Sequence, residues 1–358
     1  MYKKLFIPGP THVRESILEA QTAPMVGHRS TEYADLQAEV TPKLQKLLYT
    51  EQPVFLYTSS GTGVLEGSIR QTVLKRALVP VCGAFSERWF NIAEANGIPA
   101  DRIDVAWGEG FTPEMLDEAL SQGEYDVLTI TYNETSTGVM NPLADIAAMV
   151  RDKYPDVVIL VDAVSAMAGA KIEFDAWDLD VVVSSSQKCF ALPPGLTITP
   201  VSERALKRAE QVPNRGYYYD FLNMLKYYKR SNTPATPAIS LIQALNQQMD
   251  DILEEGLENR WARHMEMAEV VRAWARQHWA LFPNDAFLSN TVTTIENTRG
   301  VSIADLNKEL GKRGAMISNG YGSKLKEKTF RIAHMGDLTV DDVKWVLSLI
   351  DDILGLAP

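Results

Sequence analysis

The stretch that decides the fold is DVVVSSSQKCFALPPG, residues 180–195. It begins with a short valine-rich run, 180–186, and ends in Pro193, Pro194 and Gly195, which are typical of a turn. The preceding run, VVILVDAV at 157–164, is apolar at nearly every position, as central strands are when helices cover both faces of a sheet. The two runs predict consecutive strands of an α/β fold, with Asp162 at the end of one and Lys188 just past the end of the other.

The same alternation of short apolar runs with amphipathic segments extends from about residue 35 to 300. Further strands are expected at 54–60, 78–83 and 126–133, and helices at 35–48, 63–76, 113–121 and 143–153. Residues 238–280 are almost continuously helical in pattern, with Gly256 as the expected bend. After them we expect strands at 291–296 and 329–334 and helices at 302–314 and from Val340 to about Leu354. The fold class is therefore α/β, with a mostly parallel central sheet sandwiched by helices and a smaller C-terminal α+β domain.

The length of 358 residues exceeds one ordinary hydrophobic core, so more than one lobe is expected. We divide the chain into an N-terminal segment at 1–15, a large domain at 16–257 and a small domain at 258–358. The pattern contains no internal repeat and no long flexible linker.

Composition excludes several classes of protein. Hydrophobic residues make up 46% and charged residues 23%, as in ordinary globular proteins. A net charge of −11 supplies no basic field for nucleic acid. No apolar run reaches the roughly 18–20 residues that span a bilayer, and the N-terminus lacks a signal-peptide core. Two cysteines without a CxxC pair or a histidine cluster indicate neither disulfides nor a zinc site. We expect a cytoplasmic protein with no metal, membrane or nucleic-acid partner.

The position of Lys188 in the predicted sheet indicates a function for this residue. A lone lysine in a loop is usually a solvated surface residue. Here an apolar strand delivers it to the carboxyl edge of the sheet, where open α/β sheets bind ligands and where partial desolvation makes an amine nucleophilic. Asp162 ends a neighbouring apolar strand, and a carboxylate buried there needs a cationic partner. A helix cap or a salt bridge would satisfy it, and so would the protonated nitrogen of a pyridine ring.

A third motif is YTSSGTGVLEGSIR at 57–70, in which a strand is followed by Ser60, Gly61 and Thr62 and then by a helix. Small residues let backbone N–H groups approach a phosphate, and the helix N-terminus supplies a favourable dipole. A plain N-cap is the commoner explanation of such a turn. The motif lacks the lysine of a Walker loop.

These motifs, in this order, resemble the class V aminotransferases among the fold type I pyridoxal-phosphate enzymes, particularly the alanine– and serine–glyoxylate (or –pyruvate) aminotransferases. The resemblance covers nearly the whole chain. It is carried by PGPT at 8–11, YNETSTGVMNP at 132–142, VDAVSA at 161–166, SSSQK at 184–188, TPATP at 233–237 and FRIAHMG at 330–336.

The resemblance implies pyridoxal 5′-phosphate as the cofactor, bound to Lys188 as a Schiff base. Asp162 would contact the ring nitrogen and Thr135 the ring hydroxyl, while Phe85 and Val164 would lie on opposite ring faces; relatives often have tryptophan at the position of Phe85. The residues implied for the phosphate are Ser60, Gly61, Thr62, Gln187 and, from the partner subunit of a homodimer with shared sites, Thr236 and less surely Thr233, where some relatives have tyrosine.

On the substrate side, the resemblance implies that Arg331 binds the substrate carboxylate through its planar fork, with an internal ion pair as the alternative. Gly9 belongs to the N-terminal substrate loop. His28 and Arg29 would line the substrate entrance, or else cap a helix or lie on the surface. The tyrosines at 217–219 receive no role.

The expected activity is a ping-pong transamination from a small L-amino acid of the serine or alanine type to a small 2-oxo acid such as glyoxylate or pyruvate. A 2-aminoethylphosphonate-type aminotransferase is the alternative, because His28 and Arg29 could bind a phosphonate. A cysteine desulfurase needs a nucleophilic cysteine in the C-terminal part, and both Cys82 and Cys189 precede residue 190. A Rossmann-type dehydrogenase would need a GxGxxG after its first strand, which is missing.

Overall fold

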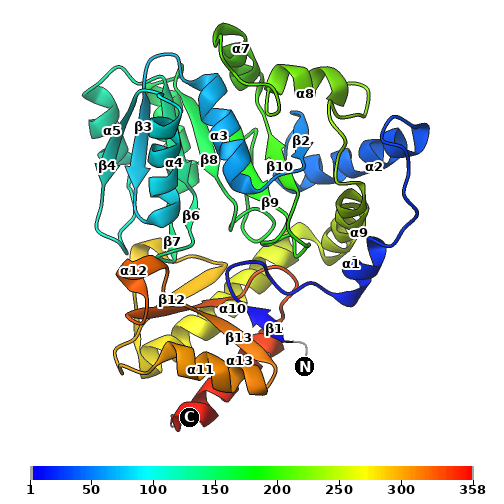
Figure 1. Cartoon of the computed structure of the whole chain (residues 1–358). Coiled ribbons are helices and arrows are strands. Elements are labelled where there is room, and N and C mark those ends of the chain that lie inside the picture. The colour runs from blue at the N-terminus through cyan, green and yellow to red at the C-terminus, as the bar shows by residue number, and fades with distance from the viewer. Residues whose placement is uncertain (1–2, 357–358) are drawn as a thin grey trace.

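The computed structural model describes residues 3–356 and builds them around two β-sheets with helices packed on both (Figure 1). The larger sheet has the strand order β2-β10-β9-β8-β5-β3-β4. The strands β4, β3, β5, β8 and β9 pair in parallel, and β10 runs antiparallel to both β9 and β2. Their bounds are β2 (Val54–Tyr57), β3 (Ala77–Val81), β4 (Ala100–Asp104), β5 (Val127–Thr131), β8 (Val158–Asp162), β9 (Val181–Ser185) and β10 (Thr197–Pro200). The expected α/β class with a mostly parallel sheet is confirmed.

The apolar run of β8 is explained by helices on both faces of the sheet. Val158 and Leu160 belong to the core on one face, and Ile159 and Val161 to the core on the other. Successive side chains of a strand point to opposite faces of the sheet. When helices cover both faces, each of these side chains is buried, so apolar residues are favoured at every position. The first face is covered by α3 (Gly61–Thr72), α4 (Ala84–Ala95), α7 (Glu203–Gln211) and α8 (Phe221–Tyr228), and the second by α2 (Thr31–Leu48), α5 (Pro113–Ser121), α6 (Leu143–Lys153) and α9 (Ile239–Glu255).

The smaller sheet has the order β1-β13-β14-β12-β11 and lies at the other end of the molecule (Figure 1). It packs on its own core with helices from the C-terminal part of the chain. The bounds are β1 (Lys4–Phe6), β11 (Ala280–Leu281), β12 (Val292–Glu296), β13 (Ala315–Asn319), β14 (Thr329–Ala333), α10 (Leu257–His278), α11 (Ile303–Lys312), α12 (Gly322–Leu325) and α13 (Val340–Leu354). The first strand, β1, pairs in parallel with β13, so the chain begins in the lobe where it ends.

The break between α9 and α10 falls at Gly256, whose φ of +85° suits glycine. We therefore propose to keep the division at residues 257 and 258, with β1 of the N-terminal segment added to the small domain's sheet. The expected strands and helices are all present, several of them shorter or shifted by a few residues. Sequence patterns missed α1 (Glu15–Ala20), α4, α7, α8, α12, β1, β4, β10, β11, β13, the two-residue strands β6 (Asn133–Glu134) and β7 (Val139–Met140), and a short 3-10 helix at Asp285–Phe287.

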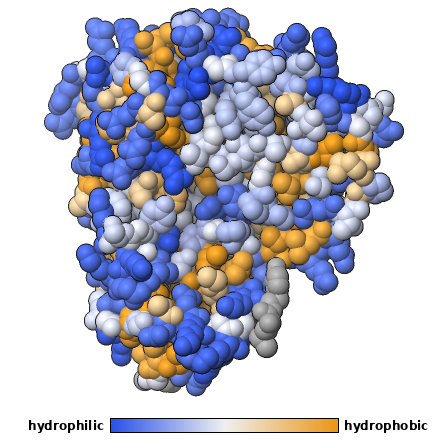
Figure 2. All heavy atoms as spheres, in the orientation of Figure 1, coloured by the Kyte–Doolittle hydropathy of each residue, from blue (hydrophilic) through white to orange (hydrophobic). Residues whose placement is uncertain are grey.

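Hydrophilic residues cover most of the face in Figure 2, with apolar residues gathered on its right side over α1 and α2. Exposed large apolar side chains in this part of the chain include Leu18 and Met25, and Met25 is 69% exposed. Within residues 3–356 no helix has both the length and the apolar character needed to cross a membrane.

Candidate active site

The carboxyl ends of the parallel strands meet around one cavity of about 200 Å³. Ser60 to Thr62 follow β2, Phe85 follows β3, and Thr135 lies in the turn between β6 (Asn133–Glu134) and β7 (Val139–Met140), directly after β5. Asp162 ends β8, and Lys188 follows β9. In an open parallel sheet this edge is where ligands bind. The cavity is lined by Ser60, Gly61, Thr62, Leu65, Phe85, Arg88, Thr135, Asp162, Val164, Ser185, Gln187 and Lys188.

Asp162 is a buried carboxylate with one hydrogen bond, which it accepts from the backbone N–H of Val164 at 2.9 Å. Burial raises the pKa of this carboxyl to about 6, and the nearby charge of Glu134 acts in the same direction. A buried carboxylate that accepts so few hydrogen bonds from the described residues would be stabilised by a cationic N–H group in the cavity. Its one hydrogen bond is to the turn that follows β8, and no described cation forms a salt bridge with it, so the salt-bridge alternative is wrong for the described residues.

Lys188 extends its amine toward the N-terminal turn, where Nζ donates to the carbonyl of Pro8. Burial lowers the pKa of this amine to about 8, although the charge of Asp162 opposes the shift. Gly9 lies against the same side chain: a Cβ there would stand 2.7 Å from Cδ of Lys188, and its φ is +116°. Only glycine fits this close approach, which places the predicted substrate loop directly beside the lysine.

The turn after β2 has the features of an anion site. Ser60 is the N-cap of α3, yet its side chain makes no capping hydrogen bond, so the plain N-cap explanation is wrong. A Cβ at Gly61 would come within 2.7 Å of the Val164 side chain. Opposite the turn, Ser185 Oγ and Gln187 Oε1 are buried without a partner among the described residues. The unpartnered Ser185 hydroxyl, beside the start of α3, suits a phosphate because it can donate a hydrogen bond to one, whereas the Gln187 oxygen can only accept.

A buried carboxylate fixes the aromatic wall of the cavity. Glu134 accepts hydrogen bonds from the backbone N–H groups of Phe85 and Ser86 and from Ser136, at the start of α4. Phe85 and Val164 both line the cavity, and Thr135 Oγ1 lies 2.7 Å from Ser165 Oγ. An aromatic side chain held in this way can stack on a flat ring. Glu134 belongs to the ETSTG part of the motif at 132–142, but the sequence alone predicted no role for it.

Arg331, on β14, is a buried cation that reaches the cavity region from the small sheet. It donates to the carbonyls of Asn319 and Thr135, and it forms no ion pair with any described carboxylate. Three of its five N–H groups are thus engaged, which leaves two for a ligand. Burial lowers the pKa of the guanidinium to about 10, so it remains charged at neutral pH. The internal ion pair considered from the sequence is therefore wrong.

Six predicted residues are not in the lining of this cavity: Gly9 and Arg331, which lie beside it as described above, and His28, Arg29, Thr233 and Thr236. Arg29 donates to the carbonyls of Thr233 and Pro234 and thereby holds the loop at 233–237. Thr233 is buried and donates its hydroxyl to the carbonyl of Ala235 at 2.8 Å, whereas Thr236 is exposed. His28, beside Arg29, is half-buried.

Two further side chains at the site were missed from the sequence. Arg88 donates to Thr62 Oγ1 at 2.9 Å and stacks over the Phe85 ring, one turn further along α4. Tyr321 packs on Phe85 from the small sheet, with ring centroids 5.0 Å apart, and lies under the guanidinium of Arg331. Predicting α4 would have placed Arg88 beside Phe85 by its three-residue spacing. No local pattern marks Tyr321, because its neighbours come from distant parts of the chain.

Neither cysteine is suited to nucleophilic chemistry. Cys82 and Cys189 are both buried and not in a disulfide. Burial raises the pKa of each thiol to about 12, so the reactive thiolate is scarce at neutral pH. This geometry agrees with the sequence argument against a cysteine desulfurase.

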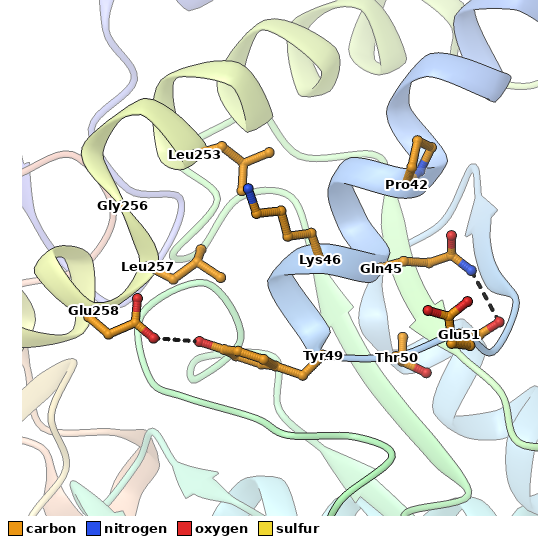
Figure 3. Close-up of a pocket in the computed structure, with 10 residues that line it drawn as sticks. All are labelled: Pro42, Gln45, Lys46, Tyr49, Thr50, Glu51, Leu253, Gly256, Leu257 and Glu258. Atoms are coloured by element: carbon orange, nitrogen blue, oxygen red, sulfur yellow. Dashed lines mark hydrogen bonds between the residues drawn. The ribbon is translucent and has the colours of Figure 1, made fainter.

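A larger hollow of about 710 Å³ lies elsewhere, where the end of α2 meets the junction of α9 and α10 (Figure 3). Its charged side chains, Lys46, Glu51 and Glu258, are exposed. Tyr49 donates to Glu258 at 3.0 Å across it. It contains no buried acid, base or nucleophile, so size alone does not make it the catalytic site.

Residues 15–344 match the family model described as aminotransferase class-V. The chain belongs to this family. Over 94% of the chain and 87% of the relative, it is 34% identical to an L-aspartate–glyoxylate aminotransferase of Paracoccus denitrificans. A serine–glyoxylate aminotransferase of Methylorubrum extorquens is 31% identical over 98% of this chain and 89% of the relative. The crystal structure of an alanine–glyoxylate aminotransferase from Nostoc sp. superposes with a TM-score of 0.92 at 27% identity, covering 99% of this chain and 96% of that one.

Pyridoxal 5′-phosphate, the cofactor of the class V aminotransferases, is therefore the cofactor of this chain. The cavity fits it on independent grounds. Asp162 is a buried carboxylate that forms no salt bridge with the described cations, Lys188 is an amine with a lowered pKa, and the unpartnered hydroxyl of Ser185 lies beside the start of α3. The fold type I architecture is likewise shared with the solved aminotransferases.

The lowered pKa of Lys188 predicts its reactivity in the cofactor-free protein. Below pH 8 the amine is protonated and unreactive, and above it the neutral amine dominates, whereas an ordinary lysine titrates near 10.4. Labelling by an amine-selective reagent, followed by peptide mapping, should give a midpoint of about 8 for Lys188. In Asp162→Asn the midpoint should fall, because the carboxylate stabilises the ammonium form. A Lys188 midpoint above 10 in the parent protein would contradict the desolvated site.

Proposed function

We propose that this protein is an aminotransferase that uses Lys188 and Asp162 to transfer the amino group of a small L-amino acid to a small 2-oxo acid. The observation that carries the proposal is the pairing of a desolvated amine and a buried carboxylate around one cavity, at the ends of two adjacent strands. Family membership sets the reaction type, and these two side chains supply what the reaction needs at defined positions.

Each side chain has a distinct part in the proposed chemistry. Bound pyridoxal phosphate supplies an electron sink that makes the α-proton of an amino acid acidic. Lys188 would hold the cofactor through its amine and, when that amine is free, would take up and return the α-proton of the substrate as general base and acid. Asp162 would keep a proton on the ring nitrogen. Phe85 and Val164 would hold the plane of the ring, and Thr135 would contact its hydroxyl.

The phosphate is proposed to be held by Ser60, Gly61, Thr62 and Gln187. The uncapped Ser60 and the unpartnered hydroxyl of Ser185 beside it support a phosphate at this place, and Gln187 lines the same cavity. Arg88, which already donates to Thr62, adds positive charge at the same end of the cavity. Charge-assisted hydrogen bonds of this kind anchor a dianion firmly.

Arg331 is proposed to bind the substrate carboxylate with its two free N–H groups. Glyoxylate is the acceptor in the names of all three relatives above, and we propose it for this chain, with serine or alanine as donor. Aspartate would need a second cation near its distal carboxylate. Among residues 3–356 of one chain, the cations that line the cavity are Lys188 and Arg88, and Arg88 lies at the phosphate end.

The phosphonate alternative depended on His28 and Arg29. Arg29 is engaged with the loop at 233–237 rather than with the cavity of its own chain, which weakens that reading. Half-reactions of the cofactor-loaded protein with serine, alanine, aspartate and 2-aminoethylphosphonate, followed by absorbance, separate the candidates. Turnover by the phosphonate alone would replace our assignment.

We also propose that the protein is a cytoplasmic homodimer whose partner chain completes each phosphate site through Thr236. The exposure of Thr236 on a proline-bounded loop supports this, as do the exposed Met25 and Tyr217 on the same chain. Thr233 is less suited to reach the partner's site, since its hydroxyl already donates to the carbonyl of Ala235 in its own loop.

Lys188→Ala should fold, bind the cofactor only non-covalently and lose turnover, because no other lysine lines the cavity. Borohydride treatment of the parent protein and peptide mapping should place the reduced cofactor on Lys188, and the variant should yield no labelled peptide. Thermal unfolding near that of the parent is the control. Cofactor fixed to another lysine would overturn the assignment.

Arg331→Leu should raise KM for both the amino and the oxo acid by roughly ten- to a hundredfold, since charge-assisted hydrogen bonds contribute about 1.5–3 kcal/mol. Both half-reactions share the carboxylate site and should weaken together. Arg331→Lys keeps the charge but loses the fork, so it should recover only part of the loss. Unchanged KM values for carboxylate substrates would make Arg331 a purely structural residue.

Mixing Lys188→Ala chains with Thr236→Asp chains tests the shared site. A heterodimer pairs the intact lysine of one chain with the intact threonine of the other in one of its two sites. Random mixing should then restore about one quarter of the parental active sites, although each homodimer is inactive. The unmixed variants, unfolded and refolded alone, are the control. No gain on mixing, or an active monomer in sedimentation, would refute the shared site.

A further inference from the structure

Residues 187–191, here called the lysine turn, follow β9. Three successive carbonyls of this turn each accept a hydrogen bond from a residue outside β9 and the turn. Gln187 O accepts from Thr11 N at 3.0 Å, and Lys188 O accepts from Thr11 Oγ1 at 3.0 Å. Cys189 O accepts from Arg260 Nη2 at 2.8 Å. Thr11 belongs to the N-terminal turn and Arg260 to α10, so two separate elements clamp the backbone that positions the amine.

Arg260 also reaches the strand that positions Asp162. Its Nε donates at 2.8 Å to the carbonyl of Ala168, in the turn after β8. Ala168 and Ala191 both have left-handed backbones, with φ of +68° and +52°, which alanine adopts at a cost. One guanidinium therefore bridges two strained turns, one following the carboxylate strand and one following the lysine.

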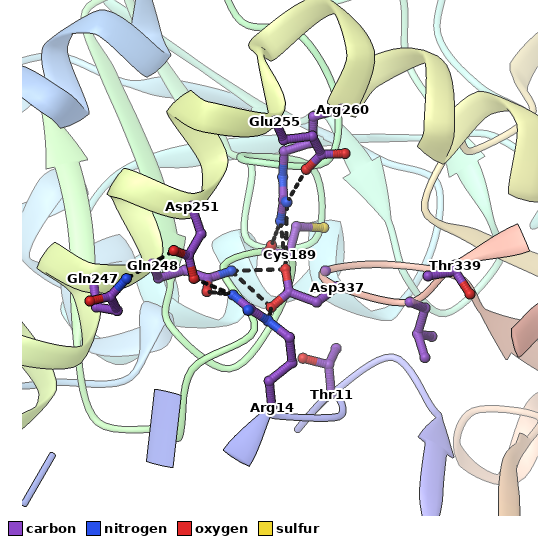
Figure 4. A network of polar contacts seen from close by, with 12 residues as sticks. Thr11, Arg14, Cys189, Gln247, Gln248, Asp251, Glu255, Arg260, Asp337 and Thr339 are labelled. Atoms are coloured by element: carbon purple, nitrogen blue, oxygen red, sulfur yellow. Dashed lines mark hydrogen bonds and ion pairs between the residues drawn. The ribbon is translucent and has the colours of Figure 1, made fainter. Parts of the chain in front are cut away.

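The charge of Arg260 is compensated by a network that joins α9, α10, the loop after β14 and the N-terminal segment (Figure 4). Its side chain is 2% exposed and pairs with Glu255 at 2.9 Å and with Asp337 at 3.5 Å. Asp337 also accepts from Arg14 of the N-terminal segment and from Gln248 of α9. A buried charge is tolerated only when its partners are this complete.

The same helix is tied to the loop after β14. His264 Nδ1 faces the carbonyl of Arg260 at 2.8 Å, and Gly336 N donates to His264 Nε2 at 3.1 Å. A Cβ at Gly336 would stand 2.9 Å from the Cβ of Ala191. Helix α10, the lysine turn and the loop that follows the Arg331 strand are thus in direct contact.

We propose that Arg260 is a positioning residue that, together with Thr11, fixes the peptide units of the lysine turn and aligns the Lys188 amine with the substrate-binding segments around Gly9 and Arg331. The inference rests on the proposed role of Lys188 as the cofactor-binding residue. Its physical basis is that proton transfer needs a near-attack geometry, in which a misplacement of about 1 Å can cost about a hundredfold in rate.

The first experiment measures the clamp without cofactor or turnover. Hydrogen exchange of the cofactor-free protein, followed by mass spectrometry, compares Arg260→Met with the parent. Peptides covering Thr11 and 187–191 should exchange at least about tenfold faster, because the backbone N–H groups of Thr11 and Ala191 donate to the carbonyls of Gln187 and Lys188 in this turn. The matched control is Arg272→Met on the same helix: Arg272 is also buried, but it donates to Ser289 and Asn290. Its exchange should rise around 289–290 and not at 187–191.

The second experiment separates positioning from mere stabilisation. In the cofactor-loaded protein, Arg260→Met should lower kcat by about ten- to a hundredfold with KM changed little, and should weaken the circular dichroism of the visible cofactor band. Arg260→Lys should recover part of kcat, since an ammonium can serve one of the two carbonyls. Arg272→Met should keep kcat within about twofold even if its melting temperature falls equally.

If Arg260→Met fails to fold, both measurements are made on Thr11→Val, which removes one hydroxyl. Thr11→Ser is its conservative control. Unchanged exchange at 187–191 in the folded variant would refute the clamp. Faster exchange with a parental kcat would show a structural network only. If cofactor maps to a lysine other than Lys188, the proposed function fails as well, whereas an intact Lys188 assignment with a parental Arg260→Met confines the failure to this inference.

Discussion

Two ionisable groups of opposite charge, Asp162 and Lys188, lie beyond the ends of adjacent parallel strands, and burial acts on them in opposite directions. It raises the pKa of the carboxyl to about 6 and lowers that of the amine to about 8. The pKa of each group is thereby brought closer to neutral pH, where proton transfer is most effective. This depends on β8 and β9 being apolar on both faces, because only a sheet covered twice by helices can bury its carboxyl edge.

The rest of the molecule is arranged around this edge. Glu134 orders the start of α4 and with it Phe85, while the N-terminal turn and α10 hold the backbone on either side of Lys188. The smaller sheet brings Arg331 and Tyr321 to the open side of the cavity. The N-terminal segment joins the two lobes, because β1 pairs with β13 of the smaller sheet and the turn that follows reaches Lys188 through Pro8 and Thr11.

The sequence predicted those parts of the site that depend on local pattern. Strand ends marked Asp162, Lys188 and the turn at Ser60 to Thr62, since apolar runs followed by polar or small residues are visible along the chain. The alternative roles of Asp162 and Arg331 could not be decided, because an ion pair depends on residues far apart in sequence. Helix α4 and strand β10 were missed, and with α4 the position of Arg88. Tyr321, Thr11 and Arg260 act through contacts between distant segments, which no periodicity records.

Arg260 illustrates why a buried charge can be kept where an apolar side chain would pack. A methionine of similar length would remove the desolvation cost but could not bind the carbonyls of Ala168 and Cys189, which would then be left unsatisfied beside left-handed turns. The two turns follow the two strands that position the carboxylate and the amine. A rigid, planar donor with several N–H groups can serve both at once, and arginine is the only side chain with that geometry. The network of Asp337, Arg14 and Gln248 then follows as the compensation that such a buried cation requires.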